Sequence, residues 1–202
     1  MSVQLAFGSA EVDGPKPDDL EGILCGPGEA VRAPAGDAAR LSIVVREPWR
    51  ADALLGLYAA IGLTGDTEPA EQGGTSVRTP FSAVLSPLVA RWTAGAVLLP
   101  PGDLVLDGGR LRAWLLGSGE PVPGRADAWQ LGLCDNADSW PRIGAALSAA
   151  GVPGVFVGPR RRGETGGAAY RVVGARRLRR LRELVGPAPS GAPLMAWPTV
   201  TR

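Results

Sequence analysis

The sequence predicts an α+β fold in which one αββαββα unit (helix, two strands, helix, two strands, helix) occurs twice. The 29 glycines and 19 prolines among the 202 residues fall between apolar runs, which indicates many short elements joined by turns. The apolar runs themselves change between the alternating pattern of strands and the three-to-four spacing of helices. Segments of the first half recur in the same order in the second half, which indicates an internal duplication.

The duplication begins with two nine-residue segments that match without a gap. These are Leu20-Glu-Gly-Ile-Leu-Cys-Gly-Pro-Gly28 and Leu111-Arg-Ala-Trp-Leu-Leu-Gly-Ser-Gly119, each followed by a glutamate. Both share a leucine, a small residue, two large apolar residues and Gly-x-Gly. We interpret each as a helix that ends at glycine.

Four further pairs of segments follow in the same order. They are the strands 41–45 with 131–135, the amphipathic helices 49–61 with 140–150, the strands 76–78 with 169–171, and the closing helices 85–92 with 178–185. Gly62 and Gly151 follow the amphipathic helices at the position of a helix C-cap.

The pairing predicts the organisation of the whole chain. It consists of an N-terminal tail (1–19), repeat one (20–92), a linker (93–110), repeat two (111–186) and a proline-rich C-terminal tail (187–202), expected to lie extended on the surface.

Composition excludes several kinds of chemistry. The sequence contains no histidine, so a Ser-His-Asp or Cys-His catalytic site is ruled out. Cys25 and Cys134 are not in a CxxC spacing, and we expect buried free thiols, no metal and no cofactor. Because no apolar run reaches about 18 residues and no signal-peptide pattern opens the chain, we expect a soluble cytoplasmic protein without a membrane partner.

With this repeated order the sequence resembles the LAGLIDADG homing-endonuclease family, over nearly the whole chain except the tails. The resemblance implies a saddle of antiparallel sheets backed by helices, in a monomer with an internal pseudo-two-fold axis. Small residues four apart, Gly22 with Gly26 and Ala113 with Gly117, would let the two signature helices pack closely side by side. Two ordinary amphipathic helices ending in glycine are the alternative interpretation.

The sequence departs from the family at the acids that bind the catalytic metals. The residue before the last glycine of each signature should be that acid, and here it is Pro27 or Ser118. Neither offers a carboxylate to a divalent cation, so we expect a protein that is not an enzyme. Glu29 and Glu120, two residues later, leave open a residual metal-dependent nuclease with a relocated site.

The resemblance also implies that the outward strand face lies along double-stranded DNA. Alternation along the strands places Leu41, Ile43 and Val45 in the core and their neighbours outward. The outward or loop residues predicted to bind nucleic acid are Arg40, Ser42, Arg46, Arg78, Gln130, Arg160, Arg161, Arg162 and Arg171. For any single arginine, ordinary solvation is the alternative, and the preference for arginine over lysine can equally reflect genome composition.

The charge of the two repeats differs. Repeat one has 6 basic and 8 acidic residues (net −2), whereas repeat two has 12 and 6 (net +6). A symmetric DNA footprint is therefore not expected. The leading hypothesis is a non-cleaving DNA-binding protein with a regulatory role, as in degenerate LAGLIDADG domains of bacterial transcription regulators. The alternative is a protein-interaction module that kept the fold.

Overall fold

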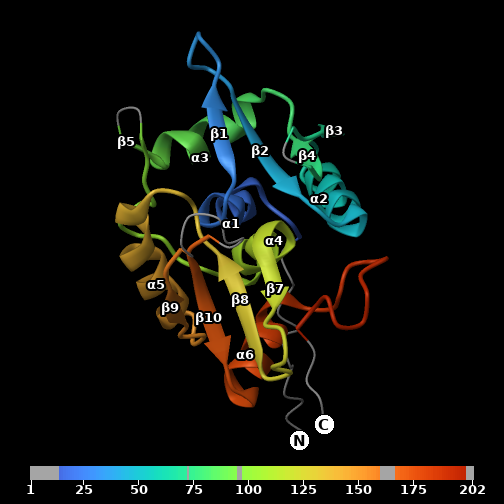
Figure 1. The fold of residues 1–202 in the computed structure, drawn as a ribbon. Helices are drawn as coiled ribbons and strands as arrows, with labels where there is room; N and C mark the ends of the chain where they lie inside the picture. Colours follow the sequence, from blue (N-terminus) through green and yellow to red (C-terminus); the bar gives the residue numbers. More distant parts are fainter. Residues whose placement is uncertain (1–13, 72, 95–96, 160–166, 199–202) are drawn as a thin grey trace, which may run out of the picture.

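The computed structural model describes residues 14–71, 73–94, 97–159 and 167–198 of the chain. Its architecture is α+β, with helices packed around two four-stranded antiparallel sheets (Figure 1). The predicted fold class is therefore confirmed.

The first half contains the expected seven elements in order. They are α1 (Glu21–Cys25), β1 (Glu29–Arg32), β2 (Ala39–Val45), α2 (Pro48–Ala60), β3 (Asp66–Pro69), β4 (Thr75–Arg78) and α3 (Ser86–Arg91). Short 3-10 turns, Pro17–Leu20 and Ala83–Leu85, precede α1 and α3.

The second half repeats the same order. Its elements are α4 (Gly108–Ser118), β7 (Gly119–Pro121), β8 (Ala128–Gly132), α5 (Trp140–Ala149), β9 (Val155–Val157), β10 (Ala169–Val173) and α6 (Ala175–Val185). Between the halves lies a small hairpin of β5 (Thr93–Ala94) and β6 (Val97–Leu98).

The two sheets have equivalent topologies. The strand order is β1-β2-β4-β3 in the first sheet and β7-β8-β10-β9 in the second. The register pairs Ser42 with Arg78 in one sheet and Gln130 with Arg171 in the other. Leu41, Ile43 and Val45 are buried, as the alternation along β2 predicts.

Local chemistry sets the ends of the helices. Pro48 occupies the first turn of α2, where its missing N–H has no intrahelical acceptor to lose. Gly62 and Gly151 follow α2 and α5 with φ angles of +78° and +81°, a conformation that favours glycine at a helix end. Asp107 caps α4 by accepting a hydrogen bond from the backbone N–H of Arg110 at 3.0 Å.

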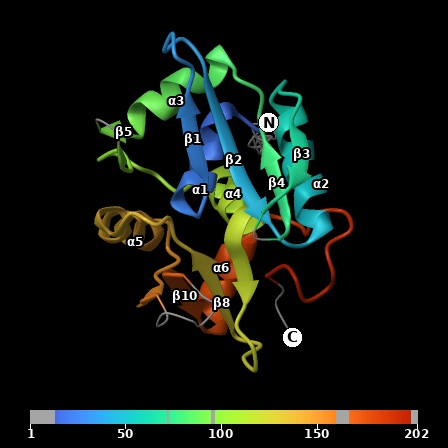
Figure 2. The ribbon, with the colours of Figure 1, turned by 45° about the horizontal axis from the view of Figure 1, so that its top comes forward.

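Helices α1 and α4 lie side by side at the centre of the molecule, between the two sheets (Figures 1 and 2). Gly22 makes this approach possible: a Cβ there would overlap the carbonyl of Arg110 and lie 2.8 Å from the backbone nitrogen of Trp114. A Cβ at Gly26 would lie 2.7 Å from the Ser118 hydroxyl. Ala113 is fully buried.

Two expectations about this region need correction. The space beside Gly117 is filled by Ile43 of β2, and an added Cβ would lie 2.6 Å from Ile43 Cδ1. The absence of a side chain at Gly117 therefore makes room for the first sheet and not for α1. Helix α1 also ends at Cys25, so Gly26 follows the helix as its C-cap and does not lie within it. The backbone is already extended at Gly26, which stops the helix before Pro27.

The C-terminal segment is more closely packed than an extended surface tail. The Trp197 ring is buried, its indole N–H donates to the Gly186 carbonyl at 3.0 Å, and the Arg112 guanidinium lies over its face. The burial of one large aromatic side chain thus anchors the segment to the core. Among the described residues, no helix combines the length and apolar character needed to cross a membrane.

Candidate functional site

A groove of about 650 Å³ lies where the two halves meet. Its walls come from the ends of α1 and α4, the end of β2, and the four strands of the second sheet. Both positions where the family would carry its metal-binding acids, Pro27 and Ser118, line this groove. The structure therefore brings the two signature ends to one place.

Neither of these two positions is free to hold a cation as a carboxylate would. Pro27 is exposed and offers no side-chain oxygen. The Ser118 hydroxyl donates to the carbonyl of Gly132 at 3.1 Å, and it lies 3.4 Å from the carbonyl of Trp114. The serine side chain thus joins α4 to β8.

The Arg50 side chain, from α2, contacts the C-terminal end of α4. Its guanidinium donates to the carbonyls of Leu115 at 2.7 Å and Leu116 at 2.9 Å, and also to the carbonyl of Gly119. Glu47 pairs with it at 2.9 Å. Burial lowers the pKa of Arg50, while Glu47 and Glu120 oppose this shift. A cationic side chain therefore caps the negative end of the α4 dipole.

Three of the predicted binding residues line the groove together. Arg46 directly follows β2, and Gln130 and Arg171 face each other across β8 and β10. Within the described ranges neither arginine forms an ion pair with a carboxylate. The Gln130 amide lies 3.5 Å from Glu120. These side chains can offer hydrogen-bond donors to an anionic ligand.

The remaining predicted residues lie elsewhere. Arg40, Ser42 and Arg78 are half-buried on the first sheet and do not line the groove. The Arg40 guanidinium lies 4.8 Å from the centre of the Phe81 ring. Arg78 pairs with Asp66 at 2.9 Å and with Glu68, both on β3. Arg160, Arg161 and Arg162 fall outside the described residues.

These ion pairs make the two sheets unequal. Hydrogen bonding and charge from Asp66 and Glu68 raise the pKa of Arg78, so this guanidinium is already compensated. The equivalent residue of the second sheet, Arg171, faces Val155 on its neighbouring strand instead of an acid. Equivalent arginines therefore differ in their neighbours: Arg78 faces an acidic residue on the adjacent strand and Arg171 faces an apolar one.

Within the described residues, the carboxylates do not form a cluster that suits a metal. Glu120 lines the groove, but Glu29 is not among the lining residues. No group of three or more Asp, Glu, His or Cys side chains within the described part of the chain is arranged to hold an ion. A relocated site built from these residues alone would therefore have fewer acidic ligands than are usual for a protein-bound divalent cation.

Sequence patterns did not reveal the role of Arg50. Its spacing from Glu47 indicates a pair within the first turn of α2, but the carbonyls that it caps are more than 60 residues away in the chain. Only the packing of α2 against α4 brings them together. Among the described residues, the groove lining is also balanced in charge, with three arginines (Arg46, Arg50 and Arg171) and three acids (Glu47, Glu120 and Asp135).

The similarity of this chain to known proteins lies in its three-dimensional structure. No family model and no curated protein matches the sequence. The N-terminal LAGLIDADG domain of WhiA superposes with a TM-score of 0.57 at 11% identity, over 85% of this chain and 82% of that domain. The homing endonuclease I-WcaI, solved bound to its DNA recognition sequence, gives 0.59 at 10% identity over 84% and 79%.

A third structure extends the similarity to a longer protein. Full-length WhiA from Thermatoga maritima superposes with a TM-score of 0.57 at 11% identity, over 85% of this chain but 55% of that protein. At such low identities these similarities establish the fold. The chain has the LAGLIDADG homing-endonuclease fold, as its two signature segments predict.

Proposed function

We propose that this protein binds double-stranded DNA in the central groove and does not cleave it. The observation that carries the proposal is the composition of the groove on a LAGLIDADG fold: Arg46, Gln130 and Arg171 line it together with Pro27 and Ser118. I-WcaI, which shares the fold, is bound to DNA in its solved structure. We further propose that its role is regulatory and not catalytic.

The absence of cleavage is argued from the chemistry at the ends of the central helices. Two-metal hydrolysis requires anionic oxygen ligands near both attacking and leaving groups. Pro27 has no such oxygen, and the Ser118 hydroxyl is neutral and donates within the protein. The Arg50 guanidinium already donates to the Leu115 and Leu116 carbonyls at the end of α4, so these oxygens are engaged within the protein.

Binding is argued from the groove side chains that carry hydrogen-bond donors. Arg46 and Arg171 can donate to phosphate oxygens, and the Gln130 amide can reach a base edge or a phosphate. Because Glu120 and Asp135 also line the groove, we expect only part of the affinity to come from counterion release.

A cleavage assay tests the first half of the proposal. Supercoiled plasmid incubated with the purified protein and Mg²⁺ or Mn²⁺ is expected to remain supercoiled, with a chelated reaction as the control. Metal-dependent cleavage that disappears in Glu29→Gln or Glu120→Gln would overturn the proposal in favour of a relocated metal site.

A binding assay tests the second half. The double variant Arg46→Gln/Arg171→Gln is expected to lower the slope of log K against log salt for a short duplex by up to about 1.8, because each lost phosphate contact contributes about 0.9. Arg32→Gln/Arg125→Gln removes the same charge from exposed positions outside the groove and is the matched control. Equal slopes in the two variants, or no salt-sensitive binding by the natural protein, would contradict groove binding.

One observation favours a protein partner as the second candidate. Val44, Val155 and Phe156 are exposed apolar side chains on the strands, with exposed fractions of 48%, 61% and 44%. Exposed apolar side chains of this kind can contribute to a protein interface. A pull-down from native lysate, with and without nuclease treatment, separates the two candidates: only a protein partner should survive complete nucleic-acid digestion.

A further inference from the structure

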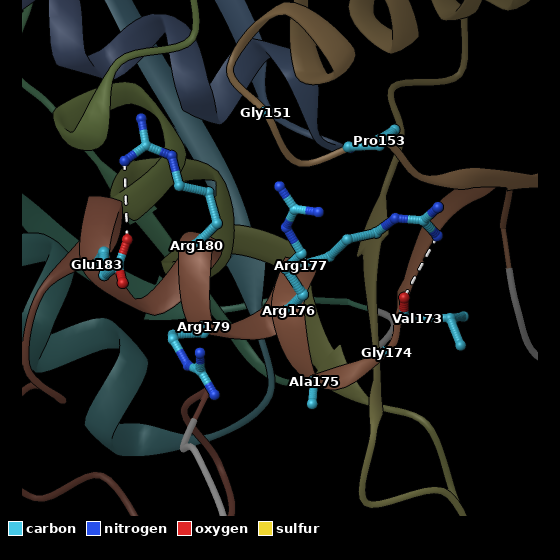
Figure 3. A pocket seen from close by; sticks show the side chains of 10 residues that line it. All are labelled: Gly151, Pro153, Val173, Gly174, Ala175, Arg176, Arg177, Arg179, Arg180 and Glu183. Carbon is cyan, nitrogen blue, oxygen red and sulfur yellow. Dashed lines mark hydrogen bonds and ion pairs between the residues drawn. The ribbon is translucent and has the colours of Figure 1, made fainter.

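The strongest positive patch on the described surface is on α6, away from the groove. Arg176, Arg177, Arg179 and Arg180 are all exposed and line one hollow of about 910 Å³, together with residues that follow α5 and end β10 (Figure 3). We call these four arginines the α6 basic face. Among the described residues that line the hollow, Glu183 is the only acidic one.

The periodicity of α6 directs these arginines outward. Leu178, Leu181 and Val185 are buried and belong to the same core as Tyr170 and Val172 of the second sheet. Arg171, between these two residues on β10, points to the opposite face of the sheet and lines the groove. Helix α6 therefore packs on the face opposite the groove, and the two hollows share no described lining residue.

The arginines are poorly compensated. The one ion pair recorded among them within the described residues joins Arg180 to Glu183 at 3.8 Å, with both side chains about half exposed. Such surface pairs contribute little. Arg177 donates to the Val173 carbonyl at 3.3 Å, and Arg180 extends toward Gly151 (Figure 3). Like charges three and four residues apart on a helix destabilise it, so an anionic partner would relieve this repulsion.

This helix also accounts for the charge of the second half. Helix α6 contains five arginines and one glutamate, whereas the other described residues of repeat two contain equal numbers of basic and acidic side chains. The surplus that distinguishes repeat two is therefore on α6 and in the segment 160–166, which lies outside the described residues. Within the described part, it is not in the groove.

We propose that the α6 basic face binds the phosphate backbone of a second duplex DNA segment. The guanidinium group matches phosphate oxygens with paired donors and stays charged at any physiological pH. A protein partner is disfavoured because the described lining of the hollow has no aromatic side chain, and its apolar residues are small: Pro153, Val173 and Ala175. Protein interfaces are usually anchored by large apolar or aromatic groups.

Two DNA sites on opposite faces would allow one molecule to bridge two duplexes. The bridging part rests on the proposed function, because it needs the groove to hold the first duplex. The contact of α6 with phosphate is independent of the proposed function, because none of the described residues that line the α6 hollow lines the groove. Separate variants can therefore test the two surfaces.

The first experiment measures the salt dependence of binding to a short duplex of random sequence. The variant Arg176→Gln/Arg180→Gln is expected to lower the slope of log K against log salt by up to about 1.8, at about 0.9 per lost contact. Glutamine has nearly the same helix propensity as arginine, so the melting temperature of the variant should be equal to or higher than that of the natural protein. Arg32→Gln/Arg125→Gln, with the same change in net charge, should leave the slope unchanged.

The second experiment measures bridging. An immobilised duplex is saturated with protein, and retention of a second, labelled duplex is recorded. Natural protein should retain it, and Arg176→Gln/Arg180→Gln should lose most of this retention while still binding the immobilised DNA.

The outcomes distinguish this inference from the proposed function. If Arg176→Gln/Arg180→Gln binds with unchanged slope while Arg46→Gln/Arg171→Gln is impaired, α6 is not a DNA surface and the groove proposal stands. If the α6 variant alone is impaired, the phosphate-binding inference stands and groove binding fails. Binding to an acidic polypeptide but to no duplex would overturn both in favour of a protein partner.

Discussion

At the scale of single residues, the close packing of the central helices α1 and α4 leaves no room for a side chain at Gly22. An added Cβ would overlap the Arg110 carbonyl, which is backbone and cannot rotate away. We expect Gly22→Ala to lower the free energy of unfolding by about 1–3 kcal/mol, the usual cost of overpacking. Urea denaturation measures this.

Gly56 supplies the matched control for that substitution. It lies within α2, is exposed, and has open space within 4 Å of the point where a Cβ would be added. Gly56→Ala should therefore raise the free energy of unfolding by about 0.5–1 kcal/mol through helix propensity. A Gly22→Ala variant as stable as Gly56→Ala would show that α1 and α4 do not pack this closely.

Two carboxyl groups near the start of α4 should respond to pH with opposite signs. Burial alone would raise the pKa of Asp107, but hydrogen bonds from the Arg110 backbone and Lys16 side chain outweigh it and hold that pKa below its usual value. Burial raises the pKa of Asp19 above its usual value. Asp107 therefore stabilises the fold above the unfolded pKa of about 3.9, and this is lost as pH falls through its folded pKa.

Asp19 contributes in the other direction. Its stabilising contribution is complete below the unfolded pKa and is lost as pH rises through the raised folded pKa. We expect Asp107→Asn to reduce the loss of unfolding free energy that accompanies a fall in pH. We expect Asp19→Asn to remove the loss of unfolding free energy that accompanies a rise in pH toward neutrality. Chemical denaturation at a series of pH values from about 2.5 to about 6.5 checks both signs. The same pH profile for both variants would contradict this assignment.

At the scale of elements, Arg50 joins α2 of the first half to α4 of the second. Its guanidinium satisfies three carbonyls at the end of α4 while being almost fully buried. We expect Arg50→Met to lower the free energy of unfolding by about 1–3 kcal/mol, because buried carbonyls lose their donor. Arg46→Met, at an exposed position with no such carbonyls, should change it by less than about 0.5 kcal/mol.

A comparable loss in both variants would show that side-chain length, rather than the capping of α4, matters. Thermal unfolding followed by far-ultraviolet circular dichroism makes the comparison directly. Since Arg50 is also next to the groove, Mg²⁺ titration of Arg50→Met tests whether its charge excludes cations. A metal-dependent rise in melting temperature of the variant alone would support that role.

At the scale of the whole molecule, the two halves share a topology but not an electrostatic surface. Arg78 and Arg171 occupy equivalent strand positions, yet only Arg78 is paired with acids among the described residues. We expect Arg171→Gln to lower the salt slope of duplex binding by about 0.9 and Arg78→Gln to change it little. Alanine at Arg160, Arg161 and Arg162 should also flatten the slope, because these residues add to the basic half.

Salt titrations of fluorescence anisotropy give these slopes. The comparison of Arg78→Gln with Arg171→Gln serves as an internal control, since both remove one arginine from an equivalent place. If the Arg78 variant has the larger effect, the first half of the saddle makes the main contact and the predicted asymmetry is wrong.

The repeated fold of this protein could be predicted from the order of its amino acids alone. Alternation along residues 41–45, the glycines that end the amphipathic helices, and the two nine-residue segments each depend on neighbours close in the chain. Periodicity and turn chemistry report such local features directly. For the same reason the two nine-residue segments themselves supply the expectation that Pro27 and Ser118 stand where the family that the sequence resembles has its metal-binding acids.

The positions of the charges, and which of them remain available to a ligand, depend on packing between distant segments. The charge of Arg78 is neutralised by acids on β3, and Arg50 caps a helix of the other half. Gly117 packs against Ile43 and not against α1. The surplus charge of repeat two, within the described residues, lies on α6 behind the sheet. None of this follows from spacing along the chain, because a side chain's electrostatic partners are fixed by contacts between segments far apart in sequence.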